Sequence, residues 1–517
     1  MTSNLISGVK RIFQTSKEDP LGAVPFPALL ELWNRRCARY PFYSAPQDGA
    51  RRVGVLVTPW LGTPVSFFNL EVARMLAGQG EHVHVMLDVA NVFGNAASPD
   101  EVQGLRSAVN ALPDSIQKIS LEDCLPTAGD PEDEVFARGL LYENGVWRMR
   151  GEARAGEFVA RKTSTLSALA SHVSRVRHLL AESGIDWLLI PGGIWGLSSI
   201  YVEAARRAGI AFTTYDSGAQ ILVVCQNGVA SHQADIPLAL TLTESAMAAR
   251  PAYRDQIIAW SHRELDERVK GRGNYITFQT QAAAGSSPFN YNVLVPLNLR
   301  WDSAALGRQR LFATVDDWVA AIVEWGAGEP LARVCIRQHP IERRAAWKSS
   351  DDVGQRLRER NPAGDRVRFI GAEEPVSTYD LLGSVRVVLP FTSSMGVEAP
   401  MLGIPVITAA HSYYEDLPFV HRAESVVHYF QLLSQSLHDG LTVSPAQGEN
   451  AAIVYYLTQH CNLMPSSFTA APADFLSWVE VSPEELWARP DTQDLQRALL
   501  TGKPLSFIRF ERYLAEA

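Results

Sequence analysis

Residues 392–407 read Thr-Ser-Ser-Met-Gly-Val-Glu-Ala-Pro-Met-Leu-Gly-Ile-Pro-Val-Ile, and this stretch decides the fold class of the chain. It follows an apolar run at 385–390 that is typical of a buried strand. It then continues through a short apolar helix and a glycine into a second apolar run at 405–408. A strand, a loop, a helix and a second strand in this order indicate a parallel α/β unit.

The loop of this unit suits an anion. Ser393, Ser394 and Gly396 stand where the helix begins, and a helix N-terminus presents unpaired N–H groups and a partial positive charge. Glu398 falls within the first helical turns, on a face that could meet a ribose. The same residues also fit an ordinary Ser/Thr cap on a core helix, so the segment taken alone leaves both interpretations open.

The composition bounds the class of protein. A chain of 517 residues predicts two to three domains, and 46% hydrophobic with 20% charged residues is typical of a globular protein. The net charge of −9 argues against a general nucleic-acid binder. The five cysteines are scattered, without zinc-like or disulfide-like spacing, so we expect no metal site and a reducing compartment.

Predicted strands and helices alternate along the chain in two series, which indicates two parallel sheets. The predicted strands of the first series are 53–57, 82–88, 186–191 and 210–215, and those of the second are 292–296, 333–337, 366–370, 385–389 and 405–408. A small, flexible run at 282–288 predicts the boundary between them. The fold class expected is therefore α/β, with two Rossmann-like domains facing each other across a cleft.

Two other segments carry weaker predictions. Asn144–Gly145 indicates a hairpin within the irregular region 96–160. The amphipathic segment 5–13 fits a helix packed on the periphery of the protein, with a helix on a membrane surface as the alternative. No apolar run reaches the length that spans a bilayer.

Polar residues follow two further strands of the second series. Arg337 and His339 end the strand at 333–337, and such a pair can hold a phosphate and stabilise charge that develops on it. A surface arginine and a capped histidine would explain the pair equally well if it stood alone. Because it shares a predicted sheet edge with Ser393 and Ser394, an anion site is the favoured interpretation.

The first strand of that series leads to Asn298, Asp302 and Ser303. These side chains could order a sugar or a phosphate, and an Asx turn at Asp302 explains them equally well.

These motifs, together with Gly403-Ile-Pro-Val406 and Tyr413-Tyr414, resemble the capsule polysaccharide biosynthesis family, which includes Kdo transferases of the GT-B fold. The His339-Pro340 and Ser393-Ser394 pairs are also similar to those of bacterial sialyltransferases and polysialyltransferases. The resemblance covers about residues 290–420. It implies an inverting, metal-independent glycosyltransferase without a cofactor. The enzyme would transfer Kdo or another ulosonic acid from a CMP-sugar to a cell-surface glycan.

The resemblance also implies domains and roles. Residues 1–287 would form the acceptor-side domain with a helical preface, 288–493 the nucleotide-sugar-binding domain, and 494–517 a C-terminal helix crossing back to the first. The His-Pro and Ser-Ser pairs would contact the nucleotide and its phosphate. Glu398 would bind the ribose.

The base that inverting transfer needs is expected in the N-terminal half. Asp216 is the first choice, because its position resembles an acidic-acidic-Gly motif of sialyltransferase-like families. In this chain Ser217 replaces the second acid, and an aspartate in a glycine turn explains the position equally well. The predicted site residues are Asp216 and His339 as catalytic groups and Arg337, Ser393, Ser394, Gly396, Glu398, Asn298, Asp302 and Ser303 as substrate-binding groups.

The expected partners are a nucleotide-sugar donor and a glycan or lipid-linked glycan acceptor, with no nucleic acid. The expected location is the cytoplasm, with peripheral association at the inner face of a bacterial membrane left open. Two other classes stay open as well. One is a sugar-nucleotide epimerase of the same fold, and the other is a non-catalytic assembly subunit.

Overall fold

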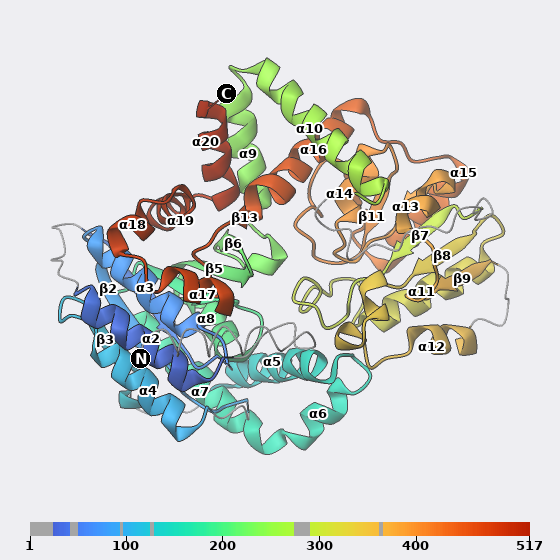
Figure 1. Ribbon diagram of the computed structural model, residues 1–517. Coiled ribbons are helices and arrows are strands. Elements are labelled where there is room, and N and C mark those ends of the chain that lie inside the picture. The colour runs from blue at the N-terminus through green and yellow to red at the C-terminus, as the bar shows by residue number, and fades with distance from the viewer. Residues whose placement is uncertain are drawn as a thin grey trace. The chain divides into compact units, whose positions relative to one another are not determined.

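The computed structural model describes residues 24–41, 50–60, 62–93, 97–124, 129–272, 290–360 and 366–516 (Figure 1). The chain forms two compact units. Unit 1 comprises Met1–Leu141, Val159–Asp235 and Asn462–Arg509, and unit 2 comprises Tyr142–Phe158, Ile236–Cys461 and Phe510–Ala517.

Unit 1 contains a seven-stranded sheet in the order β13-β6-β5-β4-β1-β2-β3. Its strands are β1 (Arg52–Val57), β2 (His82–Leu87), β3 (Gln117–Ser120), β4 (Trp187–Pro191), β5 (Ala211–Gly218), β6 (Ile221–Gln226) and β13 (Met464–Pro465). The strands from β1 to β5 pair in parallel, whereas β6 pairs antiparallel with both β5 and β13. Burial of β1 and β4 along nearly their whole length explains their continuous apolar sequences.

The described helices that lie within unit 1 are α2 (Phe26–Arg39), α3 (Val65–Gly78), α4 (Pro99–Asn110), α7 (Thr163–Ser183), α8 (Gly196–Ala208), α17 (Pro472–Trp478), α18 (Pro483–Trp487) and α19 (Pro490–Thr501), with short 3-10 turns at Leu121–Asp123 and Ala230–His232. The C-terminal segment completes the core of this unit. The ring centroids of Phe67 and Phe475 lie 6.0 Å apart, and those of Phe475 and Trp478 lie 4.9 Å apart.

Unit 2 contains a six-stranded sheet in the order β12-β11-β10-β7-β8-β9, and all of its pairings are parallel. Its strands are β7 (Val293–Pro296), β8 (Val334–Arg337), β9 (Val367–Ile370), β10 (Val387–Val388), β11 (Val406–Thr408) and β12 (Val420–Arg422). The chain runs from β7 outward to β9 on one side and then returns to place β10 on the other side of β7. The boundary between β7 and β10 is therefore the topological switch point of this sheet.

The described helices that lie within unit 2 are α9 (Ile236–Met247), α10 (Pro251–Val269), α11 (Val315–Gly328), α12 (Val353–Arg360), α13 (Thr378–Leu381), α14 (Met395–Met401), α15 (Val426–His438) and α16 (Pro445–Tyr456). Short 3-10 turns lie at Pro340–Arg343, Ala345–Trp347 and Leu382–Ser384. Helices α5 (Pro131–Met149), α6 (Ala155–Arg161) and α20 (Leu505–Glu516) and the π-helix Leu457–Asn462 contain residues of both units.

The α/β class with two Rossmann-like units is confirmed, because each unit has a largely parallel sheet built from β/α repeats. The facing of the two across a cleft stays a prediction.

The compact units differ from the predicted domains. After a short excursion at Tyr142–Phe158, the chain passes into the main segment of unit 2 at Asp235–Ile236 rather than near 287, and α10 packs within unit 2 against α16. There the Ser261 hydroxyl donates to the carbonyl of Ala452 at 2.7 Å. At the C-terminus the return to unit 1 begins already at Asn462, and the predicted single helix is α19 and α20, separated at Gly502 with its positive φ of 66°.

The predicted hairpin at Asn144–Gly145 is wrong, since both residues lie inside α5. The Asn-Gly pair does not form a turn here, because the buried side chains of Leu140, Leu141 and Val146 stabilise a continuous helix. The amphipathic segment 5–13 and the run 282–288 lie outside the described residues. Among those described, none of the helices is both long and apolar enough to cross a bilayer.

Candidate functional site

Loops of unit 2 meet at the carboxyl edge of its sheet, beside the switch point. The Oδ1 atom of Asn298, which follows β7, accepts the backbone N–H of Thr392, which follows β10, at 3.2 Å. On the other side of β7, the N–H of Leu297 donates to the carbonyl of Arg337 at 2.9 Å. Asn298 and the loop that carries Ser393 and Ser394 therefore lie next to each other at this edge of the sheet.

The Ser393–Ser394 loop differs from the predicted helix terminus. Helix α14 has only seven residues, and its first N–H groups are used within the turn: those of Gly396 and Glu398 donate to the carbonyls of Ser393 and Ser394 at 2.9 and 3.0 Å. The backbone N–H groups of Ser393 and Ser394 themselves have no hydrogen-bond partner among the described residues. The donors that this loop offers to a ligand are thus these two, with their partly exposed hydroxyls.

Gly396 serves the packing of the protein. A Cβ atom at this position would lie 2.2 Å from Cζ of the Tyr414 ring, so no larger residue fits without moving that ring. The Tyr414 hydroxyl in turn donates to the carbonyl of Ser393 at 2.8 Å. Gly396 therefore allows Tyr414 to hold the loop after β10 against the loop after β11.

Glu398, the predicted ribose ligand, is 1% exposed and engaged within unit 2. Its Oε1 accepts a guanidinium hydrogen of Arg268 at 2.9 Å, and its Oε2 accepts the hydroxyl of Tyr379 at 2.9 Å. Burial disfavours the charged form of Arg268 and by itself would lower its pKa. The nearby carboxylate of Glu398 favours the charged form, and the pKa of Arg268 is raised overall. Glu398 thus links α10, α13 and α14. Its two partners, Arg268 and Tyr379, were not among the predicted site residues.

Arg337 also has partners inside the protein. Its side chain is buried, with 1% exposure. The guanidinium donates to the carbonyls of Ile370 at 3.4 Å, of Val376 at 3.0 Å and of Gly371. This geometry fastens the loop after β9 to the end of β8, which is a structural task. A role of Arg337 in phosphate binding stays a prediction, and these contacts argue against it.

His339 is partly buried at the end of β8 and keeps its predicted place at the sheet edge. Burial, with a further contribution from the nearby Arg337 charge, lowers the pKa of His339 to about 4. The ring is therefore neutral at pH 7. Since Nδ1 accepts the N–H of Ile341 at 3.3 Å, the proton resides on Nε2. His339 can donate one hydrogen bond but adds no positive charge.

Asp302 and Ser303 occupy a turn after β7. The Ser303 hydroxyl donates to Oδ1 of Asp302 at 3.3 Å, and the Asp302 carbonyl accepts the N–H of Ala305 at 2.9 Å. Burial raises the pKa of Asp302, and the Ser303 hydroxyl partly offsets this effect. Both residues, like Asn298, follow the carboxyl end of β7, and they form the turn that was one of the two interpretations of the sequence.

Asp216 belongs to unit 1. It lies on β5, which continues past the predicted end at 215 and forms a hairpin with β6, so that Asp216 pairs with Val223. Its side chain is exposed, and its Oδ1 accepts the N–H of Ser217 at 3.1 Å. Asp216 therefore directly follows Tyr215, which pairs with Pro191 at the end of the β4–β5 ladder.

A buried polar cluster in unit 1 follows β2. Oδ2 of Asp88 lies 2.8 Å from Nε2 of His172 and accepts the Tyr201 hydroxyl at 3.1 Å, while Oδ1 accepts the N–H of Ala90 at 3.0 Å. The sequence gave no signal for His172, which lies 84 residues away from Asp88 in α7.

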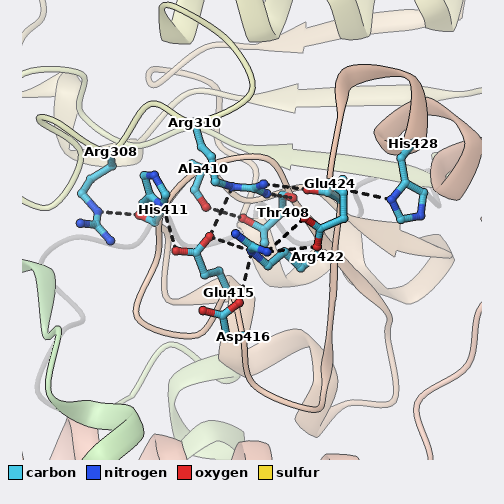
Figure 2. Close-up of polar contacts among 11 residues, drawn as sticks. Arg308, Arg310, Thr408, Ala410, His411, Glu415, Asp416, Arg422, Glu424 and His428 are labelled. Carbon is cyan, nitrogen blue, oxygen red and sulfur yellow. Dashed lines mark hydrogen bonds and ion pairs between the residues drawn. The ribbon is translucent and has the colours of Figure 1, made fainter.

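An arginine–carboxylate network in unit 2 joins the ends of β11 and β12. Figure 2 shows Arg310 and Arg422 converging on Glu415, with Arg308 and His411 at one end of the network. The Nε atoms of Arg310 and of Arg422 each lie 3.3 Å from Oε2 of Glu415. The sequence gave no signal for Arg308 and Arg310, because the long segment between β7 and α11 has no motif that places them.

Within the described part of the chain, no group of three or more histidine, cysteine or acidic side chains is arranged to hold a metal ion.

No protein-family model matches the chain, and no curated protein matches it. Solved structures are similar to it at low identity. One is the KpsC beta Kdo 2,4 transferase of Thermosulfurimonas dismutans, with 16% identity over 52% of this chain and 79% of the other, at a TM-score of 0.34. Another is a glycosyltransferase of Rickettsia africae, with 10% identity over 85% of this chain and 100% of the other, at a TM-score of 0.26.

A third similar structure is the UDP-GlcNAc 2-epimerase of Methanocaldococcus jannaschii in complex with UDP-GlcNAc and UDP, with 12% identity over 79% of this chain and 99% of the other, at a TM-score of 0.25. Likenesses of this size assign no activity to this chain.

Proposed function

We propose that the chain is a metal-independent, inverting glycosyltransferase of the GT-B class whose unit 2 binds a nucleotide-sugar donor. The observation that carries this proposal is the switch point between β7 and β10. There the Asn298–Thr392 hydrogen bond fixes two loops, and the backbone N–H groups of Ser393 and Ser394 remain as donors. Ligands of parallel α/β sheets bind at such a point, outside the carboxyl ends of the strands.

The chemistry of these donors fits a phosphate. Two successive N–H groups and two serine hydroxyls suit an anionic oxygen cluster, as does the neutral Nε2–H of His339. The resemblance to Kdo transferases and sialyltransferases supports a single phosphate, that of a CMP-linked ulosonic acid such as Kdo. The acceptor in this proposal is a cell-surface glycan or its lipid-linked form, and Asp216 is the proposed base.

The test is a thermal-shift and calorimetric panel of CMP, UDP, GDP and their sugars. We expect CMP and CMP-Kdo to raise the melting temperature of the wild type and to have little effect on a Ser393→Ala/Ser394→Ala double variant. Stabilisation by UDP or GDP without CMP would overturn the donor assignment. Turnover of a UDP-sugar without any acceptor would instead establish an epimerase.

The base is tested separately. An Asp216→Asn variant should keep donor binding and lose transfer by at least about a hundredfold, the usual contribution of a general base. Donor binding without transfer by the wild type, for any glycan offered, would point to an assembly subunit.

A further inference from the structure

A cavity of about 590 Å³ lies in unit 1, where α2 ends beside the residues that follow α17. The side chains that line it include Arg35, Arg36, Arg39, Tyr40, Val479 and Glu480. This volume falls within the range of small-molecule sites. All of these residues belong to unit 1, so the cavity is not part of the proposed donor site in unit 2.

Arg36 forms a wall of the cavity and is used by the fold. Its Nε and Nη2 donate to the carboxylate of Glu71 at 2.9 and 2.7 Å. Its Nη1 donates to the carbonyl of Val479 at 3.0 Å and to that of Val481. These bonds fasten the end of α2 to the segment after α17, so Arg36 shapes the cavity while its own donors are engaged.

Arg35, the neighbouring residue, is not used in this way. Its Nε and Nη2 have no hydrogen-bond partner, and within the described part of the chain its guanidinium forms no ion pair. Glu31 lies four residues earlier on α2, at a spacing that allows an ion pair, yet the two do not form one. Because Arg35 is only partly exposed, its charge is neither neutralised by the protein nor fully hydrated, and a ligand with negative charge would stabilise it.

Arg39 lies four residues after Arg35, so both side chains leave the same side of α2. Its guanidinium lies 3.4 Å from Oε2 of Glu480, and the two side chains are 64% and 43% exposed. An exposed pair of this kind contributes little to stability, so Arg39 can exchange it for a ligand at low cost.

Positive charge predominates at the cavity. The lining residues and the ion pairs that continue from them contain four arginines and two carboxylates, namely Arg35, Arg36, Arg39, Arg74, Glu71 and Glu480. The carbonyl end of α2 would repel an anion, but the carbonyl of Tyr40 accepts a guanidinium hydrogen of Arg74 at 2.6 Å, which offsets this repulsion. The cavity therefore fits an anionic ligand better than a neutral one.

We propose that this cavity binds the phosphate group of a phosphate ester, and that Arg35 and Arg39 contact its oxygens. Each planar guanidinium offers paired N–H groups, and a phosphate has enough oxygens to accept from two such forks, whereas a carboxylate has only two oxygens. The volume exceeds that of one phosphate group and leaves room for the alcohol part of the ester. The ester is either a lipid headgroup or a soluble compound. This inference goes beyond the proposed function and does not depend on it.

The experiment is isothermal titration calorimetry of the full chain with inorganic phosphate at constant ionic strength, with acetate for comparison. We expect the wild type to bind phosphate at least about tenfold more tightly than acetate. Arg35→Gln should weaken phosphate binding at least about tenfold, and Arg35→Lys, which keeps the charge without the planar fork, should fall between the two. Without phosphate, Arg35→Gln should melt like the wild type, because the guanidinium donates to no protein group.

Arg138→Gln is the matched control, because it removes the same charge from an exposed helical position in unit 1. It should leave the phosphate affinity unchanged, and so should the Ser393→Ala/Ser394→Ala double variant, which tests the proposed donor site in unit 2. Four results would overturn the inference: no phosphate binding by the wild type, acetate bound as tightly as phosphate, unchanged phosphate affinity in Arg35→Gln, or a clearly lower melting temperature of Arg35→Gln without phosphate. The last result would show that the fold uses Arg35.

Two further ligands distinguish the sources of the ester. Sedimentation with phosphatidylcholine vesicles that contain phosphatidylglycerol, but not with phosphatidylcholine alone, would identify a lipid headgroup if Arg35→Gln abolishes it. Binding of glycerol 3-phosphate that depends on Arg35, without sedimentation, would identify a soluble ester. Binding of inorganic phosphate but of neither ester would mean an adventitious ion only and would overturn the inference.

Discussion

The switch points of the two sheets are built alike but filled differently. In unit 1 Trp60, after β1, packs beside Gly192, after β4, where an added Cβ would lie 3.3 Å from the indole. In unit 2 the crevice between β7 and β10 is bordered by Asn298, Ser393 and Ser394, with main-chain donors left over. A polar residue at a strand end is evidence for a ligand only when the protein does not already use it.

The same contrast holds for charged groups. In unit 1 Asp88 uses both carboxylate oxygens on His172, Tyr201 and the backbone. In unit 2 Arg337 is used in this way, whereas the Nε2–H group of His339 at the same edge remains as a donor. The following predictions test which strand-end groups stabilise the fold and which serve the ligand.

Arg337→Met should have the largest effect. It leaves buried carbonyls without their donor, so the free energy of unfolding in urea should fall by about 3 to 5 kcal/mol. The control is Arg333→Met, an exposed arginine one residue before the same strand, which should change stability by less than about 0.5 kcal/mol. A variant that folds with wild-type stability but loses CMP binding would reverse our assignment of Arg337 and make it a ligand of the donor.

Asp88→Ala should come next, with a loss of about 3 kcal/mol, because His172 and Tyr201 remain buried without their acceptor. Chemical denaturation measures the loss, and calorimetry at a temperature where the variant is folded should show unchanged CMP affinity. The exposed Asp100 in α4 provides the control variant Asp100→Ala. Weakened CMP binding by folded Asp88→Ala would show that this cluster is not merely structural.

His339 should make stability depend on pH. Its pKa is lowered from 6.5 to about 4 in the folded protein, so the unfolded chain takes up a proton first as the pH falls. The stability that the neutral ring contributes is complete above pH 6.5 and is lost progressively between pH 6.5 and 4. At pH 5 this loss amounts to about 1 to 2 kcal/mol.

The measurement for His339 is the free energy of unfolding at pH 7.5 and pH 5. His339→Asn, which keeps a capping side chain, should lose less stability between the two values than the wild type does. Equal losses in both proteins would mean that the histidine is not held neutral by the fold.

Ser394→Ala should have the smallest effect and should act on binding alone. Ser394 precedes α14 without a side-chain capping bond, so removing its hydroxyl should cost less than about 0.5 kcal/mol of stability. CMP affinity should fall about tenfold, or about 1.4 kcal/mol. Ser384→Ala, whose hydroxyl bonds to the carbonyl of Tyr291 away from the rim, is the control. Unchanged CMP affinity in Ser394→Ala would exclude its hydroxyl from the site.

The sequence predicted β1, β2, β4, β5 and β7 to β11, because buried parallel strands are continuous apolar runs that need no tertiary information, and it missed β3, β6, β12 and β13. It also predicted that His339 and the Ser393–Ser394 loop follow strands of the same sheet edge, since the carboxyl ends of parallel strands share an edge. It could not predict which polar groups the protein itself would occupy. Arg268 and Glu398 are 130 residues apart, and no local pattern announces their pairing.

The missed residues share a physical reason. Arg308 and His172 lie in segments whose position is set by packing rather than by a turn or a period, one in a long loop and the other within a helix. The compact units divide the chain elsewhere than the predicted boundary for a similar reason, since α10 packs on α16 and that contact joins distant parts of the chain.

The division of unit 1 into three chain segments has a consequence for folding during synthesis. Its core contains Phe475 and Trp478, so the part of α3 around Phe67 that packs against Phe475 stays uncovered until the segment Asn462–Arg509 has been made. At about 5 to 20 residues per second, this delay lasts roughly a quarter of a minute to a minute after Asp235 emerges. Throughout that interval the N-terminal segments expose apolar surface that is prone to aggregate. The main segment of unit 2, in contrast, is complete as soon as Cys461 has been made.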